Sequence, residues 1–301
     1  MLFDSHAHIN NERYDEAGRA EVVRAIEASD VGYVVDIGFD VASSKLAAAH
    51  AAAYPWCYAA VGVHPGEVSS MADSDIDELH ALAVGDARDW AKETLTEDTP
   101  PGTPAAKGKV VAIGEIGLDY HYDDGPPAEK QRYWFERQLA LGLELGMPIT
   151  VHDRESGGET LEILEQSGAF AASRTSAFPR GLRAEAAADG FPDARVLLHC
   201  FSGNADEALA AIRLGAWISV AGPVTFKNNA KTQEVASAAP LSRLLIETDS
   251  PYLTPAPHRG KPNMPPYVEF TARRIAELRG ISYEELAAAT TENAKRFYGI
   301  A

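Results

Sequence analysis

Two histidines lie one residue apart near the start of the chain, in the stretch DSHAH, where His6 and His8 follow a short apolar segment. Side chains of a β-strand alternate between its two faces, so residues i and i+2 point to the same side. If this stretch ends a strand, both imidazoles lie close together and can hold one metal ion. The alternative is a pair of surface histidines beside the N-terminus.

Other potential metal ligands also stand at the ends of apolar runs. They are His64 in VGVHP, Glu115 in GEIGLDY, His152 in PITVHD, His199 in RVLLHC and Asp249 in ETDSP. Imidazole nitrogen and carboxylate oxygen suit Zn²⁺, Mn²⁺ and related divalent ions. Taken alone, His64 could be a hydrogen-bonded structural residue, and Asp249 could cap a turn before Pro251. Because the candidates are too many for one ion, we expect two metals.

Eight short apolar runs rich in β-branched residues precede these ligands or alternate with them. The runs start at Met1, Tyr33, Cys57, Val110, Pro148, Arg195, Trp217 and Leu244. Between them, segments such as 21–30, 129–146 and 204–215 repeat apolar residues at the three- and four-residue spacing of amphipathic helices. This alternation predicts an α/β fold with a parallel sheet, and eight repeats favour a closed barrel.

The expected fold is therefore a (β/α)8 TIM barrel that forms a single domain over residues 1–301. The carboxyl ends of the strands of such a barrel meet at one face, where its active sites lie. Ligands scattered from His6 to Asp249 can thus share one pocket. No G-x-G-x-x-G follows the first run, so the main sign of a dinucleotide-binding fold is missing.

Some segments do not follow the repeat. Residues 96–109 are rich in Pro and Gly, residues 171–194 also lack a strand or helix pattern, and we interpret both as loop insertions. The C-terminal part predicts two helices, with Thr290 or Thr291 as the N-cap of the last one.

Composition limits the partners and the location. The 27 basic and 44 acidic residues give a net charge of −17, which argues against broad contact with nucleic acid or anionic membrane. Cys57 and Cys200 both lie in apolar runs, as buried thiols of a reducing compartment do. No apolar run approaches the roughly 20 residues of a membrane span. We expect a cytoplasmic protein, and nothing in the sequence marks a surface for a protein partner.

Seven motifs together resemble the TatD family of metal-dependent deoxyribonucleases, within the wider amidohydrolase group of α/β barrels. They are FDSHAH, VGVHP, GEIGLDY, VHDRES, LHCFSG, ETDSPYLTP and PHRGKPN, and they run from residue 3 to residue 263. The resemblance implies a phosphodiester hydrolase that acts on DNA, or on RNA, as an exonuclease at strand ends. It also implies a water activated by two divalent ions, with Zn, Mn and Mg as candidates.

The resemblance further implies how the ligands are shared between the two ions. One ion would be held by His6, His8, Glu115 and Asp249, and the other by Glu115, His152 and His199, so that Glu115 bridges them. Asp249 would also accept a proton from the attacking water, which makes Asp249 and Glu115 the expected catalytic residues.

Four further residues are expected to contact the substrate, namely His64, Lys227, His258 and Arg259. The planar donor fork of Arg259 suits a phosphate oxygen. Since the net charge repels a long polyanion, we expect local capture of a strand end or a single-stranded tail.

Two other classes of function remain open. One is another hydrolase of the same barrel type, with amide, lactone or deaminase chemistry, although many of these carry a lysine where this chain has Glu115. The other is a non-catalytic protein with a structural metal. Structural zinc sites are usually closed and rich in cysteine, whereas these ligands include none.

Overall fold

The computed structural model describes residues 1–85, 109–171 and 190–300. Eight parallel strands form one sheet in the order β1 to β8, curled into a nearly closed barrel. The strands are β1 (Leu2–Ala7), β2 (Val31–Ile37), β3 (Cys57–Val61), β4 (Val110–Asp119), β5 (Ile149–Arg154), β6 (Val196–Leu198), β7 (Trp217–Val220) and β8 (Leu244–Ile246). Each begins within or beside one of the eight predicted runs, so the predicted TIM-barrel fold and its single α/β domain are confirmed.

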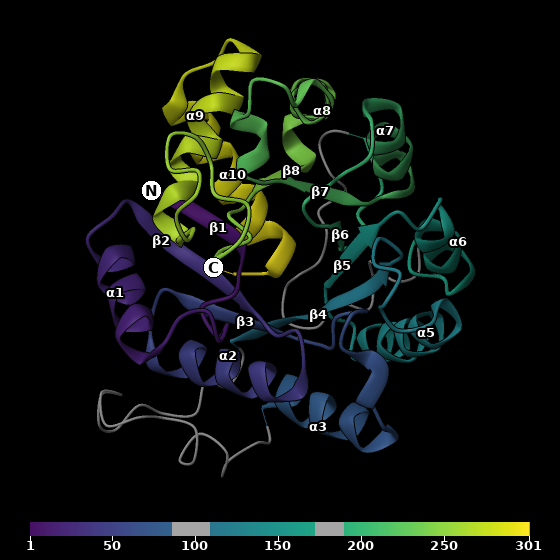
Figure 1. Ribbon diagram of the computed structural model, residues 1–301. Helices are drawn as coiled ribbons and strands as arrows, with labels where there is room; N and C mark the ends of the chain where they lie inside the picture. The colour runs from purple at the N-terminus through teal and green to yellow at the C-terminus, as the bar shows by residue number, and fades with distance from the viewer. Residues whose placement is uncertain (86–108, 172–189, 301) are drawn as a thin grey trace.

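Helices follow the strands and form an outer ring around the barrel (Figure 1). They are α1 (Glu16–Glu27), α2 (Val41–Ala53), α3 (Asp73–Val84), α5 (Ala128–Glu144), α6 (Glu159–Gln166), α7 (Ala205–Leu214), α8 (Ala230–Ala238), α9 (Val268–Arg279) and α10 (Tyr283–Tyr298). Their apolar sides cover the outside of the sheet, which is why strands such as β1 and β8 are buried at every position. No helix among the described residues is both long and apolar enough to cross a membrane.

The seam between β8 and β1 is held mainly by side chains. The backbone supplies a single parallel bridge there, between Ala7 and Ser250. In addition, the Ser5 hydroxyl donates to Ile246 O at 3.0 Å, and buried Asp4 accepts from the backbone N of Thr248 at 2.9 Å. These bonds bring the end of the first strand against the end of the last, although the two are about 240 residues apart in sequence.

Glycines let β4 approach its neighbours closely around Glu115. Gly114 and Gly117 have φ of 153° and 147°, values that other residues rarely adopt. A Cβ on Gly117 would lie 1.9 Å from His152 O, and one on Gly114 would lie 2.6 Å from Thr150 O. The backbone of β4 therefore approaches β5 closely on either side of Glu115, and this approach fixes the position of the carboxylate.

One local expectation is wrong, and others lie outside the described residues. The last helix begins earlier than predicted, because Ser282 is its N-cap and accepts from Glu285 N, while the Thr290 hydroxyl donates to Leu286 O within the helix. Most of the two predicted insertions, 96–109 and 171–194, falls in the segments 86–108 and 172–189 that the structure does not describe.

Candidate metal centre

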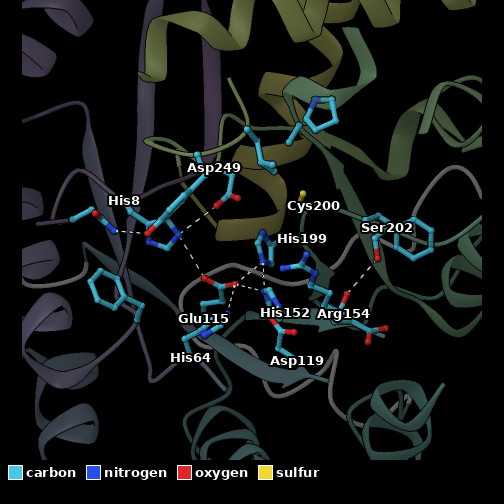
Figure 2. A pocket seen from close by; sticks show the side chains of 18 of the residues that line it. His8, His64, Glu115, Asp119, His152, Arg154, His199, Cys200, Ser202 and Asp249 are labelled. Carbon is cyan, nitrogen blue, oxygen red and sulfur yellow. Dashed lines mark hydrogen bonds and ion pairs between the residues drawn. The ribbon is translucent and has the colours of Figure 1, made fainter. Parts of the chain in front are cut away.

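The carboxylate of Glu115 lies at the centre of a cluster of imidazoles at the carboxyl ends of the strands (Figure 2). Each of its two oxygens faces a different pair of histidines. The cluster contains all six residues predicted as metal ligands, which are His6, His8, Glu115, His152, His199 and Asp249. They come from β1, β4, β5 and the residues that follow β1, β6 and β8, as strand ends at one barrel face require.

The first half of the cluster contains His6, His8 and Asp249. Glu115 Oε2 lies 3.4 Å from His6 Nε2 and 3.6 Å from His8 Nε2. Asp249 Oδ1 lies 3.7 Å and 3.4 Å from the same two nitrogens. The i, i+2 spacing of the histidines thus brings both rings to one point, as predicted for a strand end. Asp249 reaches this position with a φ of 55°, a conformation that is costly for a non-glycine residue and that recurs at functional sites.

The second half contains His152 and His199. Glu115 Oε1 lies 2.7 Å from His152 Nδ1 and 2.6 Å from His199 Nε2. The two imidazole nitrogens are themselves 3.3 Å apart. The Glu115 carboxylate therefore links the two halves, one oxygen to each.

Outer hydrogen bonds determine which ring nitrogen faces the cluster. His8 Nδ1 donates to Ile37 O at 2.8 Å, so its Nε2 carries the lone pair. His152 Nε2 donates to Asp119 Oδ2 at 3.1 Å, which turns the lone pair of Nδ1 inward. His199 Nδ1 lies 3.4 Å from the fully buried carboxylate of Glu247, which turns Nε2 inward. In each case, the nitrogen that faces Glu115 is the one able to bind a metal ion.

The imidazole nitrogens that face Glu115 are spaced as a bound cation requires. Nε2 of His6 and Nε2 of His8 are 3.2 Å apart, close to the 3.3 Å between the facing nitrogens of His152 and His199. Two neutral imidazole lone pairs at such a distance repel each other unless a proton or a metal ion lies between them. The donor set of neutral imidazoles and carboxylates matches the preference of divalent zinc or manganese. The residues present therefore fit the metal that the chemistry of the cluster implies.

The charges within the cluster support the same interpretation. Burial opposes ionisation of Glu115, but His199 and His152 outweigh it and hold the pKa of this carboxyl well below its usual range. Burial likewise opposes charge on His199, but Glu115 and Glu247 raise the pKa of its imidazole well above its usual range. The carboxylates thus draw positive charge into the cluster, and divalent metal ions would supply that charge in place of protons.

His64 lies beside the cluster but presents a hydrogen-bond donor to the pocket instead of a lone pair. Its Nδ1 accepts from Gly66 N at 2.9 Å, so its Nε2 carries the hydrogen, and that atom is 3.9 Å from Glu115 Oε1. Burial lowers the pKa of His64 to about 3, with His152 adding to the effect, so the ring is neutral at neutral pH. A neutral ring with Nε2–H directed at the pocket is a hydrogen-bond donor rather than a metal ligand.

The cluster lies at the bottom of a cavity of about 920 Å³, a typical size for a small-molecule site. His64 lines this cavity, but the other three predicted substrate contacts lie elsewhere. His258 stacks on Tyr267 with ring centroids 4.2 Å apart, Arg259 lies over the ring of Phe226 at 4.2 Å, and Lys227 is exposed. The structure therefore brings His64 to the metal ligands and leaves His258, Arg259 and Lys227 outside the lining of the cavity.

Two residues that contact the imidazoles of the cluster escaped the sequence analysis, Asp119 and Glu247. Asp119 accepts from His152, Glu247 lies beside His199, and both lie in motifs already singled out, GEIGLDY and ETDSP. The available signal was the two-residue period of a strand, because Asp119 follows Glu115 by four residues and Glu247 precedes Asp249 by two. Only the terminal acidic residue of the ETDSP motif was considered as a ligand.

Comparisons with known proteins agree with this geometry. The family model described as TatD related DNase matches residues 3–299. The uncharacterized metal-dependent hydrolase YabD of Bacillus subtilis is 38% identical over 300 residues, which cover 100% of both chains. The 3'-5' ssDNA/RNA exonuclease TatD of Pectobacterium carotovorum is 29% identical over 306 residues, again 100% of both. The crystal structure of YJJV, a TatD homologue of Escherichia coli, matches with a TM-score of 0.78 and 26% identity over 100% of this chain and 98% of that one.

An eight-stranded parallel barrel with buried imidazoles and carboxylates at its mouth defines a metal-dependent hydrolase with an amidohydrolase-type barrel. More narrowly, the chain belongs to the family of TatD-related DNases. The resemblance that the seven motifs carry is therefore confirmed.

Proposed function

We propose that the protein is a two-metal phosphodiesterase that removes nucleotides from the ends of DNA strands. The observation that carries the proposal is the shared carboxylate of Glu115, whose Oε2 faces His6 and His8 while its Oε1 faces His152 and His199. When bound, two divalent ions a few ångströms apart lower the pKa of a shared water and neutralise charge on the phosphoryl oxygens.

Each half of the cluster supplies ligands for one ion. His6, His8 and Asp249 would hold the first, His152 and His199 would hold the second, and Glu115 would supply one oxygen to each. Because a hydrogen bond to Asp119 orients the His152 ring and the Glu247 carboxylate lies 3.4 Å from His199 Nδ1, the protein would need little rearrangement to bind the second ion.

Asp249 serves as the general base. Its carboxylate lies at the open side of the first half, within 3.7 Å of both His6 and His8. Burial raises the pKa of a carboxyl group, but His8 and His6 outweigh burial and keep the pKa of Asp249 below its usual range. It is therefore ionised and able to accept a proton from the attacking water while it remains a ligand.

His64 binds the substrate as a neutral donor. The backbone N–H of Gly66 fixes its tautomer, and Nε2–H can therefore donate to a non-bridging phosphate oxygen. Arg259, His258 and Lys227 remain predicted contacts for more distant parts of the strand, outside the cavity itself.

Two features favour this function over the alternatives. A structural metal site is closed, whereas this cluster opens into a cavity of about 920 Å³. Amide, lactone and deaminase chemistry on the same barrel often uses a lysine as the bridging group, whereas this chain has the carboxylate of Glu115. In addition to these two features, a relative that aligns over 100% of both chains is named a 3'-5' ssDNA/RNA exonuclease, which supports a nucleic acid substrate.

The test is hydrolysis after chelation and addition of Mn²⁺, Mg²⁺ or Zn²⁺, with a generic phosphodiester, an amide and a lactone as substrates. We expect metal-dependent cleavage of the phosphodiester alone. Cleavage of the amide or the lactone without cleavage of the phosphodiester would show that the protein is another kind of hydrolase and not a nuclease.

The preference for strand ends has its own test. A linear single strand, an RNA strand, a blunt duplex and a closed circle of the same sequence are compared. Because the chain carries a net charge of −17, we expect the linear single strand to be cut fastest and the closed circle poorly. Binding should also show a shallow salt dependence, since a log–log slope of about −0.7 accompanies each phosphate neutralised in a single strand. Equal cleavage of the circle and the linear strand would exclude capture at an end.

A further inference from the structure

Two arginine–tyrosine pairs stand at the rim of the cavity, on opposite sides of the metal ligands. The lining of the cavity includes Arg13 and Tyr252, which follow β1 and β8, and also Tyr122 and Arg154, which follow or end β4 and β5. In a barrel of order β1 to β8, the β8–β1 seam lies across the mouth from β4 and β5. Figure 2 accordingly shows Arg154 on the side of Glu115 away from His8.

The first pair is fixed against the ligands of the first half. The guanidinium carbon of Arg13 lies 4.5 Å from the centre of the Tyr252 ring. The Tyr252 hydroxyl accepts from Asn11 Nδ2 at 3.1 Å, and the ring meets His8 edge-on at 6.3 Å. The Arg13 side chain itself is exposed. This pair therefore presents a cation and an aromatic ring directly beside the first half of the cluster.

The second pair is more open. The guanidinium carbon of Arg154 lies 5.1 Å from the centre of the Tyr122 ring, and its Nη1 donates to the Tyr122 hydroxyl at 3.2 Å. Tyr122 is 58% exposed, which is unusual for a large ring that has no partner in solution. Arg154 lies two residues beyond the ligand His152 on the same strand, so it points to the same side of β5.

Neither arginine is neutralised by the protein. Within residues 1–85, 109–171 and 190–300, Arg13 and Arg154 form no ion pair with a carboxylate, although acidic residues outnumber basic ones by 44 to 27 in the chain. Other arginines of the described chain, such as Arg137 with Asp73 at 2.9 Å, do form such pairs. Two guanidinium groups free of carboxylates at the mouth of an acidic protein are available for an anionic ligand.

We propose that each pair binds one nucleotide unit of a single-stranded polynucleotide, so that the strand crosses the mouth with the scissile phosphate over Glu115. The guanidinium fork contacts a phosphate, and the tyrosine ring stacks on a base. One pair holds the nucleotide to be released and the other holds the retained strand. This inference rests on the proposed function for its substrate class and adds the requirement that both sides of the cleaved bond carry a nucleotide.

The test measures binding of the full chain with its metals to a labelled phosphorothioate oligodeoxynucleotide, which resists cleavage. Tyr122→Leu and Tyr252→Leu should each weaken binding roughly 5- to 150-fold, the range for loss of one base stack, without changing the salt slope. Arg13→Gln and Arg154→Gln should each make the log–log salt slope shallower by about 0.7. Hydrolysis of a small diester, too short to reach either pair, should change less than binding of the oligonucleotide.

The chain offers a matched control on α5. Arg137 lies over the ring of Tyr133 at 5.8 Å and donates to its hydroxyl at 3.0 Å, and Tyr133 is 48% exposed, but neither residue lines the cavity. Tyr133→Leu should leave both oligonucleotide binding and small-diester hydrolysis unchanged. If Tyr252→Leu fails to fold because its ring is partly buried, the exposed Arg13 still tests the first pair.

The outcomes separate this inference from the proposed function. If the wild-type protein cleaves the small diester but the variants of either pair bind the oligonucleotide as tightly as Tyr133→Leu does, the two-pair arrangement is overturned and the phosphodiesterase stands. If the wild-type protein binds no oligonucleotide, the inference also fails. If it binds through both pairs but cleaves no diester with any metal, the proposed reaction fails and the binding sites remain.

Discussion

The two ends of the barrel both bury charged side chains, but they satisfy them in opposite ways. At the amino ends of the strands, Asp193 accepts from Trp217 Nε1 at 2.9 Å and from Arg195 Nε at 3.3 Å, and Arg195 Nη1 donates to Phe297 O at 3.0 Å. Every one of these contacts joins a donor to an acceptor. At the carboxyl ends, the lone pairs of four imidazoles and two carboxylates converge instead.

This difference separates a stabilising network from a reactive one. The Asp193 network is complete without any ligand, so it contributes to folding alone. The Glu115 cluster is complete only with cations, which is the physical mark of a metal centre. Substitutions at the two ends should therefore affect different properties, and four experiments test that division.

The largest effect is expected from Glu115→Gln. The amide has one carbonyl oxygen and no charge, so it cannot link the two halves, and kcat for a generic phosphodiester should fall about 10³-fold. The metal-free variant should still fold but unfold at a lower temperature than the metal-free wild type, because His152 and His199 lose the carboxylate they pair with. Turnover at the wild-type rate would refute a bridging role for Glu115.

The next experiment removes one half of the cluster. Replacing both His152 and His199 with Ala should lower the metal content by about one ion per chain, because the first half keeps its own ligands in a two-metal site. Elemental analysis after dialysis against limiting Mn²⁺ or Zn²⁺ provides the measurement. Unchanged stoichiometry would show that the two halves do not bind separate ions.

At the opposite end of the barrel, Asp193→Asn should act on stability. Loss of the carboxylate removes the buried ion pair with Arg195, and breaking such a pair costs about 3 kcal/mol of unfolding free energy. Urea unfolding followed by fluorescence measures the loss. Activity per folded molecule should stay at the wild-type value. A fall in activity without a fall in stability would contradict the assignment of stability to the amino ends of the strands and of activity to the carboxyl ends.

Much of the barrel was predictable because its strands are buried on both faces. The run YVVDIG and the segment LLI that opens LLIETDSP carry apolar residues at nearly every position, as a parallel strand covered on both faces does. The ligands were predictable for a related reason: a polar residue at the end of such a run, His199 for example, has few structural roles. Residues of irregular segments gave no such signal, so Arg13 and Tyr122 were missed.

The N-cap of the last helix shows a second limit of sequence reasoning. Ser282, Thr290 and Thr291 all have a hydroxyl able to cap a helix. The sequence pattern predicts Thr290 or Thr291 as the N-cap, but the cap is Ser282, and the Thr290 hydroxyl donates to Leu286 O. Intrinsic preference alone cannot choose between a cap and an interior threonine. Tertiary packing decides, since Leu286 and Ala287 are buried and extend the helix back to Tyr283.

The smallest effect is expected from Asp119→Asn, which tests whether a residue outside the ligand set tunes metal affinity. Asp119→Asn keeps the size of the side chain and a hydrogen-bond acceptor for His152 Nε2 but removes the charge that makes this imidazole a better ligand. Metal affinity at the second half should fall roughly 10- to 100-fold, while turnover at saturating metal stays near the wild-type value. The measurement is a titration of activity with Mn²⁺.

Asp153 supplies the matched control for that experiment. It directly follows His152 on β5, yet its Oδ1 accepts from the Thr160 hydroxyl at 3.1 Å rather than from an imidazole. Asp153→Asn also removes one negative charge near His152, but it leaves the orientation of the His152 ring unchanged. If both variants weaken metal binding equally, the effect is one of net charge at the mouth. A larger loss in Asp119→Asn assigns the effect to the hydrogen bond that turns Nδ1 of His152 toward Glu115.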